Sequence, residues 1–211
     1  MKRLILLFVV TIQTMVAMAD VSGKCGDNLT WTYTESTQTL TIVGTGAITN
    51  FSSYIVVPWY SLRGVIKHVV IGDGVTSIGN YAFYDCGALV SVTIGNTVAT
   101  IGYNAFFGCG ALLKVYCYAL EIPVLSVGAF SDIIKATLYV PSRIVAAYGA
   151  AMEWDFFASI KSLTDDPSGI ESIRDARLKT NTYYDLNGGK MIGTPTQKGM
   201  YIVNGNKVVI K

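Results

Sequence analysis

Between residues 66 and 112 the hydrophobic positions follow one pattern that is written twice. The segment IKHVVIGDGVTSIGNYAFYDCGAL (66–89) is followed by LVSVTIGNTVATIGYNAFFGCGAL (89–112), and twelve of the 24 aligned positions are identical at an offset of 23 residues. A unit this short cannot bury its own apolar face, so copies of it must stack on one another. The period therefore predicts a solenoid, a fold that offers a surface and implies no particular reaction.

Each unit is predicted to contain one strand and one turn region. Leu89–Ile94 has the spacing of a leucine-rich repeat strand, and Gly95 ends that strand. Residues 103–107 are predicted to form a short helix or a single helical turn, and a last strand, 137–140, follows at the same step. The expected fold is a right-handed leucine-rich repeat solenoid, rich in β-strand with short helical turns, with its repeats at 66–141.

The 23-residue step predicts which side chains lie beside one another on adjacent strands. One ladder is expected to be buried: Ile71, Ile94, Cys117 and Val140. Because side chains alternate between the two faces of a strand, the neighbouring ladder should face solvent. Together with the nearby Tyr118, this ladder forms the candidate binding face: Val70, Thr93, Tyr116, Tyr118 and Tyr139. Exposed adjacent tyrosines favour a contact site, and the alternative is ordinary packing of the tyrosines beneath a C-terminal cap.

The flanking segments have patterns of their own. Residues 29–33 and 39–42 alternate apolar and polar side chains around a turn, which predicts a β-hairpin that covers one end of the stack. A degenerate first repeat follows, and its aromatic residues are expected to fill a coil's interior: Phe51, Tyr54, Trp59 and Tyr60. The predicted division is a signal peptide (1–19), hairpin cap and degenerate repeat (20–65), repeats (66–141), amphipathic helical cap from an N-cap at Ser142 (142–163), linker (164–169) and a small all-β module of two hairpins (170–211).

The first 19 residues have the pattern of a secretory signal peptide, with a basic start, a short apolar run and Ala17-Met18-Ala19 before Asp20. Removal of this segment takes away two of the 16 basic residues, which leaves 14 basic and 14 acidic residues. No basic cluster then indicates nucleic acid as a partner. No later segment has the length of a transmembrane helix, so the protein is expected to be secreted or displayed at the cell surface.

Little in the sequence indicates catalysis or a cofactor. His68 is the only histidine, which excludes a metal site built on histidines, and it is expected on the outward face of a strand. Cys86 and Cys109 occupy the same place in successive repeats, and with Cys117 they are interpreted as small buried side chains. A bridge between Cys86 and Cys109 stays open as an alternative. The prediction is a protein that is not an enzyme and that has no cofactor or metal.

The repeat IGDGVTSIGNYAFYDCGAL resembles the BspA-like leucine-rich repeat family, and the flanking segments CGDNLTWTYTESTQTLTIVGTGAI and TLYVPSRIVAAYGAAMEW are similar to modules that border such repeats. The resemblance implies an exported or surface-displayed protein of a Gram-negative bacterium, with no shared catalytic residues and with adhesion to host proteins or other cells. The ending YYDLNGGKMIGTPTQKGMYIVNGNKVVIK is similar to type IX sorting domains, although Gly189 stands where those have arginine.

Two functions are consistent with these observations. In the first, the solenoid binds a host or bacterial surface protein or a glycan. In the second, it is a structural or assembly component of the cell envelope without a soluble ligand, and it associates through the ends of the solenoid. A stack of so few coils presents a small face, so binding by one copy is expected to be weak unless several copies act together.

Overall fold

The computed structural model describes residues 20–133 and 135–166, together with the backbone of four short strands nearer the C-terminus. The strands of the main body are β1 (Val21–Gly26), β2 (Asn28–Thr34), β3 (Thr39–Ala47), β4 (His68–Ile71), β5 (Val75–Ile78), β6 (Ser91–Ile94), β7 (Thr100–Ile101), β8 (Lys114–Cys117), β9 (Val124–Leu125), β10 (Thr137–Val140) and β11 (Ser159–Ser162). Its α-helix is α1 (Val145–Ala150), and short 3-10 helices lie at Glu35–Thr37, Tyr54–Val56, Tyr60–Leu62, Ser142–Ile144, Met152–Trp154 and Leu163–Asp165.

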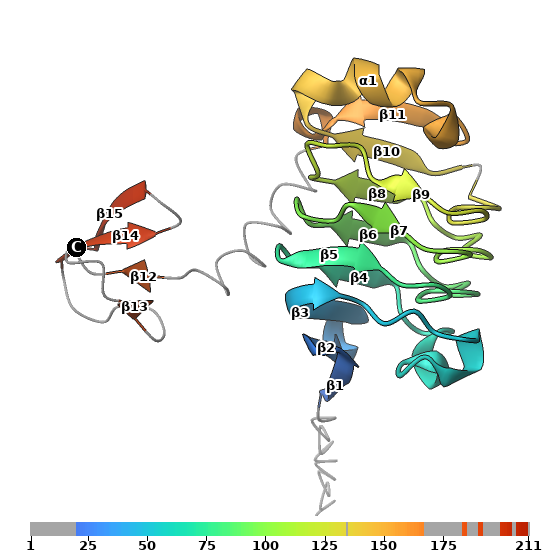
Figure 1. The fold of residues 1–211 in the computed structure, drawn as a ribbon, viewed down its shortest axis with the longest axis horizontal. Coiled ribbons are helices and arrows are strands. Elements are labelled where there is room, and N and C mark those ends of the chain that lie inside the picture. The colour runs from blue at the N-terminus through green and yellow to red at the C-terminus, as the bar shows by residue number, and fades with distance from the viewer. Residues whose placement is uncertain are drawn as a thin grey trace, which may run out of the picture.

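The coils stack through two parallel sheets that share β3 (Figure 1). The longer sheet runs in the order β3-β4-β6-β8-β10-β11, and the shorter one in the order β3-β5-β7-β9. Strand partners in the longer sheet follow the predicted step, since Ile71 pairs with Ile94 and Ile94 with Cys117. The register that the repeat predicted for β4, β6, β8 and β10 is therefore confirmed, and with it the solenoid.

The core lies inside the coils, between the two sheets and the turns. The predicted inner ladder is buried, with exposed fractions of 0–1% for Ile71, Ile94, Cys117 and Val140. A second column is aromatic and runs through every coil. Its rings are parallel within 22° between Trp59 and Phe83, 11° between Phe83 and Phe106, and 3° between Phe106 and Phe130. Full burial of a large apolar side chain contributes roughly 1.5–3 kcal/mol, so these columns dominate the stability of the stack.

Of the two conformations predicted for the turn of each coil, a short helix or a single helical turn, the short helix is not formed. Residues 103–107 form consecutive tight turns, and Asn104 has a positive φ of 51°. Backbone N–H groups here donate to the next coil, as from Phe106 to the Ala129 carbonyl at 2.8 Å. An α-helix would direct these donors along its own axis and leave the adjacent coil without them, so stacking favours the turns over a helix.

The N-terminal region contains the predicted hairpin, β2 and β3, paired antiparallel. It also contains β1, which the sequence analysis did not predict because VSGKCG has almost no apolar alternation. Among the aromatic residues expected to fill the degenerate first repeat, Phe51 and Trp59 are buried. Tyr54 is 37% exposed and Tyr60 is half-buried, so these two were assigned wrongly to the interior.

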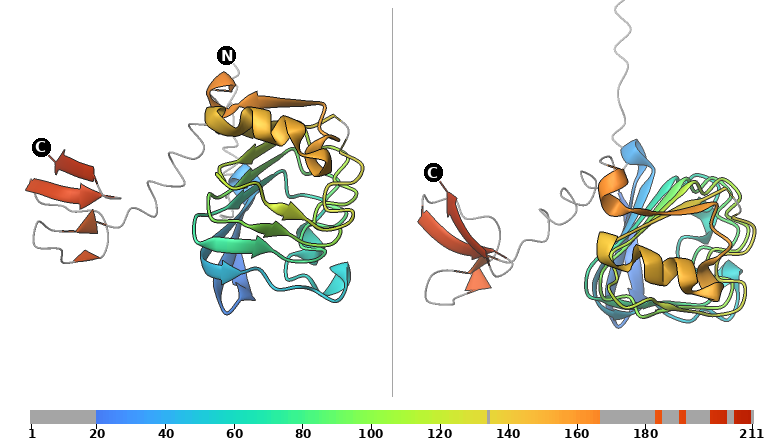
Figure 2. Two further views of the ribbon diagram at one scale, coloured as in Figure 1. Left: turned by 45° about the horizontal axis from the view of Figure 1, so that its top comes forward. Right: turned by 90° about the horizontal axis from the view of Figure 1, so that it is seen from above.

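The other end of the stack carries α1, which lies across the last coil (Figure 2). The segment is less helical than expected: Ser142 begins a 3-10 helix and makes no N-cap bond, and β11 extends the sheet as a parallel partner of β10. Tyr148 and Trp154 are fully buried, whereas Met152, which falls at helical spacing from Tyr148, is 84% exposed.

The four cysteines are buried thiols. The interpretation of Cys86, Cys109 and Cys117 as small buried side chains is confirmed, and Cys86 and Cys109 are not bridged. The Cys109 thiol lies 3.2 Å from the Phe83 carbonyl, to which it donates a weak hydrogen bond. Burial raises the pKa of Cys86 to about 12, so this thiol is a poor nucleophile at neutral pH.

Residues 1–19, where the signal peptide is predicted, lie outside the described residues. In the C-terminal region the described backbone forms an antiparallel sheet in the order β13-β12-β14-β15. Its strands are β12 (Tyr183–Tyr184), β13 (Lys190–Met191), β14 (Gly199–Val203) and β15 (Asn206–Ile210). The rest of the predicted tail module lies outside the described residues.

Candidate binding surfaces

The outer face of the longer sheet carries the ladder proposed from the sequence. Val70 pairs with Thr93, Thr93 with Tyr116, and Tyr116 with Tyr139. The rings of Tyr116 and Tyr139 stack with centroids 5.1 Å apart. Tyr118 follows the end of β8 and is half-buried. The predicted neighbour relations are therefore correct.

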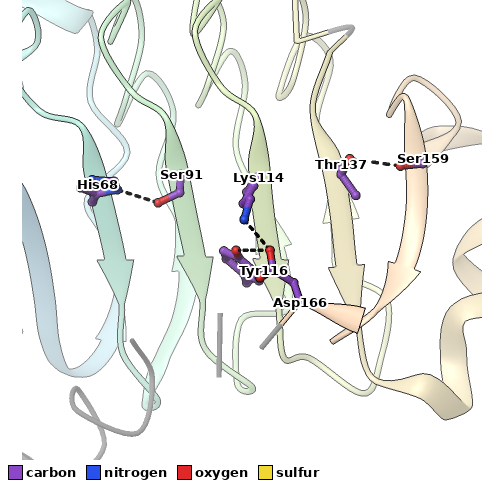
Figure 3. A network of polar contacts seen from close by, with 7 residues as sticks. All are labelled: His68, Ser91, Lys114, Tyr116, Thr137, Ser159 and Asp166. Atoms are coloured by element: carbon purple, nitrogen blue, oxygen red, sulfur yellow. Dashed lines mark hydrogen bonds and ion pairs between the residues drawn. The ribbon is translucent and has the colours of Figure 1, made fainter. Parts of the chain in front are cut away.

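The predicted exposure of this ladder is wrong. Tyr116 is 5% exposed, Tyr139 8% and Thr93 8%, while Val70 is half-buried. Part of the cover is Asp166, which reaches the outer face of β8 from the segment after β11 (Figure 3). The alternation of side chains along a strand predicts whether a side chain points into or out of the coil. It does not predict which other segments cover the outer face of the sheet.

Lys114 and Tyr116 hold Asp166 over this face. Its carboxylate accepts hydrogen bonds from the Lys114 ammonium and from the Tyr116 hydroxyl, the latter at 2.9 Å. Because Asp166 is only 7% exposed, loss of a partner would leave a buried carboxylate with fewer donors, which is costly. The hydrogen bond to Asp166 raises the pKa of Lys114, and burial raises the pKa of Tyr139.

The segment that carries Asp166 was predicted to be a linker from residue 164, and residues 164–166 are instead structured. Asp165 belongs to a capping box, in which its carboxylate accepts from the Ser162 backbone N–H at 3.1 Å. Local capping thus fixes the chain where it turns back towards the sheet. Residues 167–169 of the predicted linker lie outside the described residues.

A polar column runs beside the tyrosine ladder on the same face. His68 Nδ1 lies 2.8 Å from Ser91 Oγ, and Thr137 Oγ1 lies 3.1 Å from Ser159 Oγ (Figure 3). Burial, then the charge of Lys67, lowers the pKa of His68. A serine hydroxyl bound to histidine is one part of a nucleophilic relay, which also needs a group that orients the imidazole. Among residues 20–133 and 135–166, the His68 imidazole makes no hydrogen bond other than the one with Ser91.

The turns carry a second surface that the sequence analysis did not single out. Here the rings of neighbouring coils form a continuous cluster, which we call the tyrosine ridge: Tyr54, Tyr60, Tyr81, Tyr84, Tyr103 and Phe107. Tyr84 stacks on Tyr54 at 4.8 Å and on Phe107 at 5.2 Å between ring centroids. Tyr103 is 42% exposed. The signal that could have found the ridge is the 23-residue offset between Tyr84 and Phe107, applied to the turn as it was applied to the strand.

Charged and apolar side chains border the ridge. The Arg63 guanidinium lies over the ring of Tyr60, 4.1 Å from its centroid, and its Nε is 3.8 Å from an Asp85 carboxylate oxygen. Ile55 and Val56 are 57% and 55% exposed. Aromatic and arginine side chains beside exposed apolar ones are the composition that protein interfaces favour.

The described part of the chain contains neither a cluster of three or more metal-ligating side chains nor a helix with the length and apolarity needed to cross a membrane. What it does contain is a stack of 23-residue coils with parallel strands on one side and tight turns on the other, a scaffold of the binding type.

Comparison with known proteins identifies the family. The model of the BspA type leucine rich repeat region matches residues 59–175 in six copies, and the chain belongs to this family. The family indicates a bacterial type of surface or binding protein, and its repeats are typically non-enzymatic scaffolds. Comparison with the curated proteins finds no match.

Among solved structures, the chain is similar to a leucine-rich repeat protein from Eubacterium ventriosum ATCC 27560. The sequences are 23% identical and the TM-score is 0.43. The similarity covers 68% of this chain and 40% of that protein, so this chain spans well under half of the other's length.

Proposed function

We propose that this protein is exported by a Gram-negative bacterium and binds another protein at the cell surface through the tyrosine ridge. The observation that carries the proposal is the run of partly exposed rings from Tyr54 to Phe107, which continues across successive coils. Aromatic side chains supply much of the binding energy in interfaces at a low cost in conformational entropy. A folded monomer gains little from leaving such rings next to Ile55 and Val56 in water.

The ridge is a better candidate than the sheet face because its side chains are accessible. Tyr54 and Tyr103 are 37% and 42% exposed, whereas Tyr116 and Tyr139 are covered. A partner could reach the ridge without any rearrangement of the solenoid. A partner at the tyrosine ladder would first have to displace Asp166 from its hydrogen bonds with Lys114 and Tyr116.

The ridge suits a protein better than a glycan. Sugars bind aromatic residues by stacking on an open ring face, but the faces of Tyr84 are covered on both sides by Tyr54 and Phe107. Ring edges and hydroxyl groups are left for contact, and the Arg63–Asp85 pair supplies a polar rim. Edge contacts and a polar rim are typical of protein interfaces.

Export is proposed to follow cleavage before Asp20, with residues 170–211 as the sorting or anchoring module. Mass spectrometry of the protein recovered from the native bacterium's surface should then find Asp20 at the N-terminus. Deletion of 170–211 should abolish surface display and retain the protein in the periplasm. Retention of residues 1–19 in the surface protein, or display without the tail, would contradict the corresponding part of the proposal.

The binding proposal is tested with the chain from Asp20 onward, applied to arrays of host matrix proteins, bacterial surface proteins and glycans. A Tyr54→Ala/Tyr103→Ala variant should lose binding to the parent's protein ligand by roughly tenfold or more, as expected for interface anchors. The matched control is Val65→Ser/Leu113→Ser, which removes two side chains that are 45% and 48% exposed elsewhere. The control should bind like the parent.

The other outcomes discriminate between hypotheses. Binding only to glycans, with the ridge variant unaffected, would contradict a protein ligand at the ridge. If no surface ligand is found and the parent self-associates as its concentration rises, the alternative function as an assembly component of the envelope becomes the better explanation.

A further inference from the structure

The turn side of the solenoid is held together by backbone hydrogen bonds that run in one direction. The N–H groups of one coil donate to carbonyls of the next, from Asn104 to Val127 at 3.2 Å and from Phe106 to Ala129 at 2.8 Å. The preceding coil shows the same pattern. Each coil therefore presents donors towards the C-terminal end of the stack, and every inner coil meets acceptors there.

The last of these turns has the donors but not the acceptors. Gly128 and Phe130 are the equivalents of Asn104 and Phe106, one residue further on because this coil is longer. Gly128 has the same left-handed backbone conformation as Asn104, with φ of 73° and 51°. Among residues 20–133 and 135–166, the Gly128 and Phe130 N–H groups make no hydrogen bond, although the Asn104 side-chain oxygen lies close to Gly128.

A groove lies where a further coil would supply those acceptors. It has a volume of about 520 Å³ and is lined by residues 125–133 of the last coil and by Glu153 and Phe156. Its apolar walls include Val127, which is 79% exposed, and Phe156, which is 38% exposed. On the sheet side, by contrast, β11 pairs with β10 and continues the ladder. The stack is thus closed on one side and open on the other.

The chemistry of the groove defines its ligand. Two N–H donors separated by two residues match two carbonyls with the same separation on an extended peptide, as in β-strand addition. Asp132 and Glu153 line the groove, and their carboxylates oppose a phosphate or sulfate and favour a basic side chain. Gly128 is half-buried, so water can solvate its N–H in the open groove at little cost, whereas Phe130 is only 2% exposed.

We propose that this groove is a second binding site, which takes an extended peptide segment of another protein chain with a basic side chain near the two N–H donors. The peptide backbone accepts hydrogen bonds from Gly128 and Phe130 in place of a missing coil. Its apolar side chains pack against Val127 and Phe156. The site shares no residue with the tyrosine ridge, so either proposal can fail without the other.

The test screens the chain from Asp20 onward against an array of short synthetic peptides of random sequence, together with overlapping peptides copied from this chain. Peptides bound by the parent should be enriched in lysine and arginine. In ¹H–¹⁵N spectra, the best of them should shift the Gly128 and Phe130 amide signals and slow their hydrogen exchange. The Asn104 and Phe106 amides, already hydrogen-bonded, should be protected before any peptide is added.

Two matched variants locate the binding. Ser126→Trp fills the groove, and Ala99→Trp adds the same side chain at an exposed position of the preceding coil. Both positions keep the backbone bond that joins them to the coil before. Ser126→Trp should weaken peptide binding by about tenfold or more, and Ala99→Trp should leave it unchanged. An Asp132→Asn/Glu153→Gln variant should lose the preference for basic peptides.

The outcomes are decisive in both directions. Peptides that bind equally to parent and Ser126→Trp, an array with no bound peptide, or binding without a change at Gly128 and Phe130 would overturn the proposal. If the only bound peptides come from this chain, and Ser126→Trp abolishes concentration-dependent association, the occupant is a second copy. Protection of the Asn104 and Phe106 amides in each variant shows that the solenoid is intact.

Discussion

The strands and the turns of these coils derive from the same repeat, yet the two sides of the solenoid differ. On the sheet side, the strands pair without interruption in the order β3-β4-β6-β8-β10-β11, and the outer face is partly covered by Asp166. On the turn side, each pair of coils is joined by only two or three backbone hydrogen bonds between the turns, the rings of the tyrosine ridge are partly exposed, and the stack ends at an open groove. The same repeat thus forms a continuous hydrogen-bonded sheet on one side and leaves partly exposed aromatic side chains on the other.

The sharpest way to break this comparison is to remove two adjacent phenylalanines separately. Phe106 is fully buried in the aromatic column, and Phe107 is half-buried in the ridge. Phe106→Ala should lower the free energy of unfolding by about 3–5 kcal/mol, as large-to-small changes in a core do. Phe107→Ala should cost about 1 kcal/mol, the scale of one aromatic pair.

Urea denaturation of the two variants measures the difference. If the costs were equal, the ridge would be as much a part of the core as the column is, and its rings would be poor candidates for binding. Phe107→Tyr, which keeps the ring, serves as the control for the ridge position.

The close approach of coils can be compared at two glycines. A Cβ atom at Gly79 would lie 1.9 Å from the Thr49 carbonyl oxygen, whereas one at Gly110 would meet nothing within 4 Å. Gly79→Ala should destabilise by about 1–3 kcal/mol, because backbone must move to relieve the overlap. Gly110→Ala should be neutral or stabilise by up to about 1 kcal/mol through the unfolded chain. Thermal unfolding of both variants tests this, and a tolerated Gly79→Ala would mean that the first coils are not tightly stacked.

Asp166 makes the sheet face differ from the ridge, and its contacts can be removed one at a time. Tyr116→Phe deletes the hydroxyl that donates to Asp166 and should cost about 1 kcal/mol, the net value of one hydrogen bond. Tyr103→Phe, which removes a hydroxyl of the partly exposed ridge away from Asp166, is the control. Denaturant unfolding gives both values.

The pKa of Lys114 sharpens the same test. The pKa of Lys114 is raised in the folded state above the ordinary lysine value of 10.5. The contribution of this ammonium to stability is therefore complete below pH 10.5 and is lost as the pH rises above 10.5. Lys114 is 41% exposed, so the effect is reduced by solvent. Lys114→Met should flatten the alkaline loss of stability, and an unchanged pH profile would show that the contact with Asp166 contributes nothing.

The sequence predicted the sheet side well because each rung repeats at a fixed distance along the chain. The strand register and the buried ladder of Ile71 and Ile94 follow from local periodicity. The burial of Tyr116 does not, because its cover comes from Asp166, 50 residues away. No period connects those two positions, so the candidate face was assigned correctly as a row of neighbours and wrongly as a solvent-exposed surface.

The turn side was harder to predict for a different reason. An Ala-Phe pair fits a helix as well as a tight turn, and the choice is made by hydrogen bonds to the next coil. β11 was missed because Ser159–Ser162 has a single apolar residue and pairs with β10 at a step of 22 residues from Thr137. In both places tertiary pairing, which the local pattern does not show, decided the conformation.

The smallest expected effect comes from the polar column of the sheet face. Burial and Lys67 lower the pKa of His68, so the unfolded chain binds a proton more readily than the folded protein does. Stability from this site is therefore complete above pH 6.5 and declines as the pH falls below it. The decline should be under about 0.5 kcal/mol, because the site is half-exposed and screened by solvent.

His68→Gln should remove that decline, since glutamine can still bond to the Ser91 hydroxyl but does not titrate. Ser91→Ala should retain it, because the histidine and its burial stay in place. Thermal unfolding measured on both sides of pH 6.5 compares the three proteins, and a parent that became more stable on acidification would show that the environment of His68 favours its charged form.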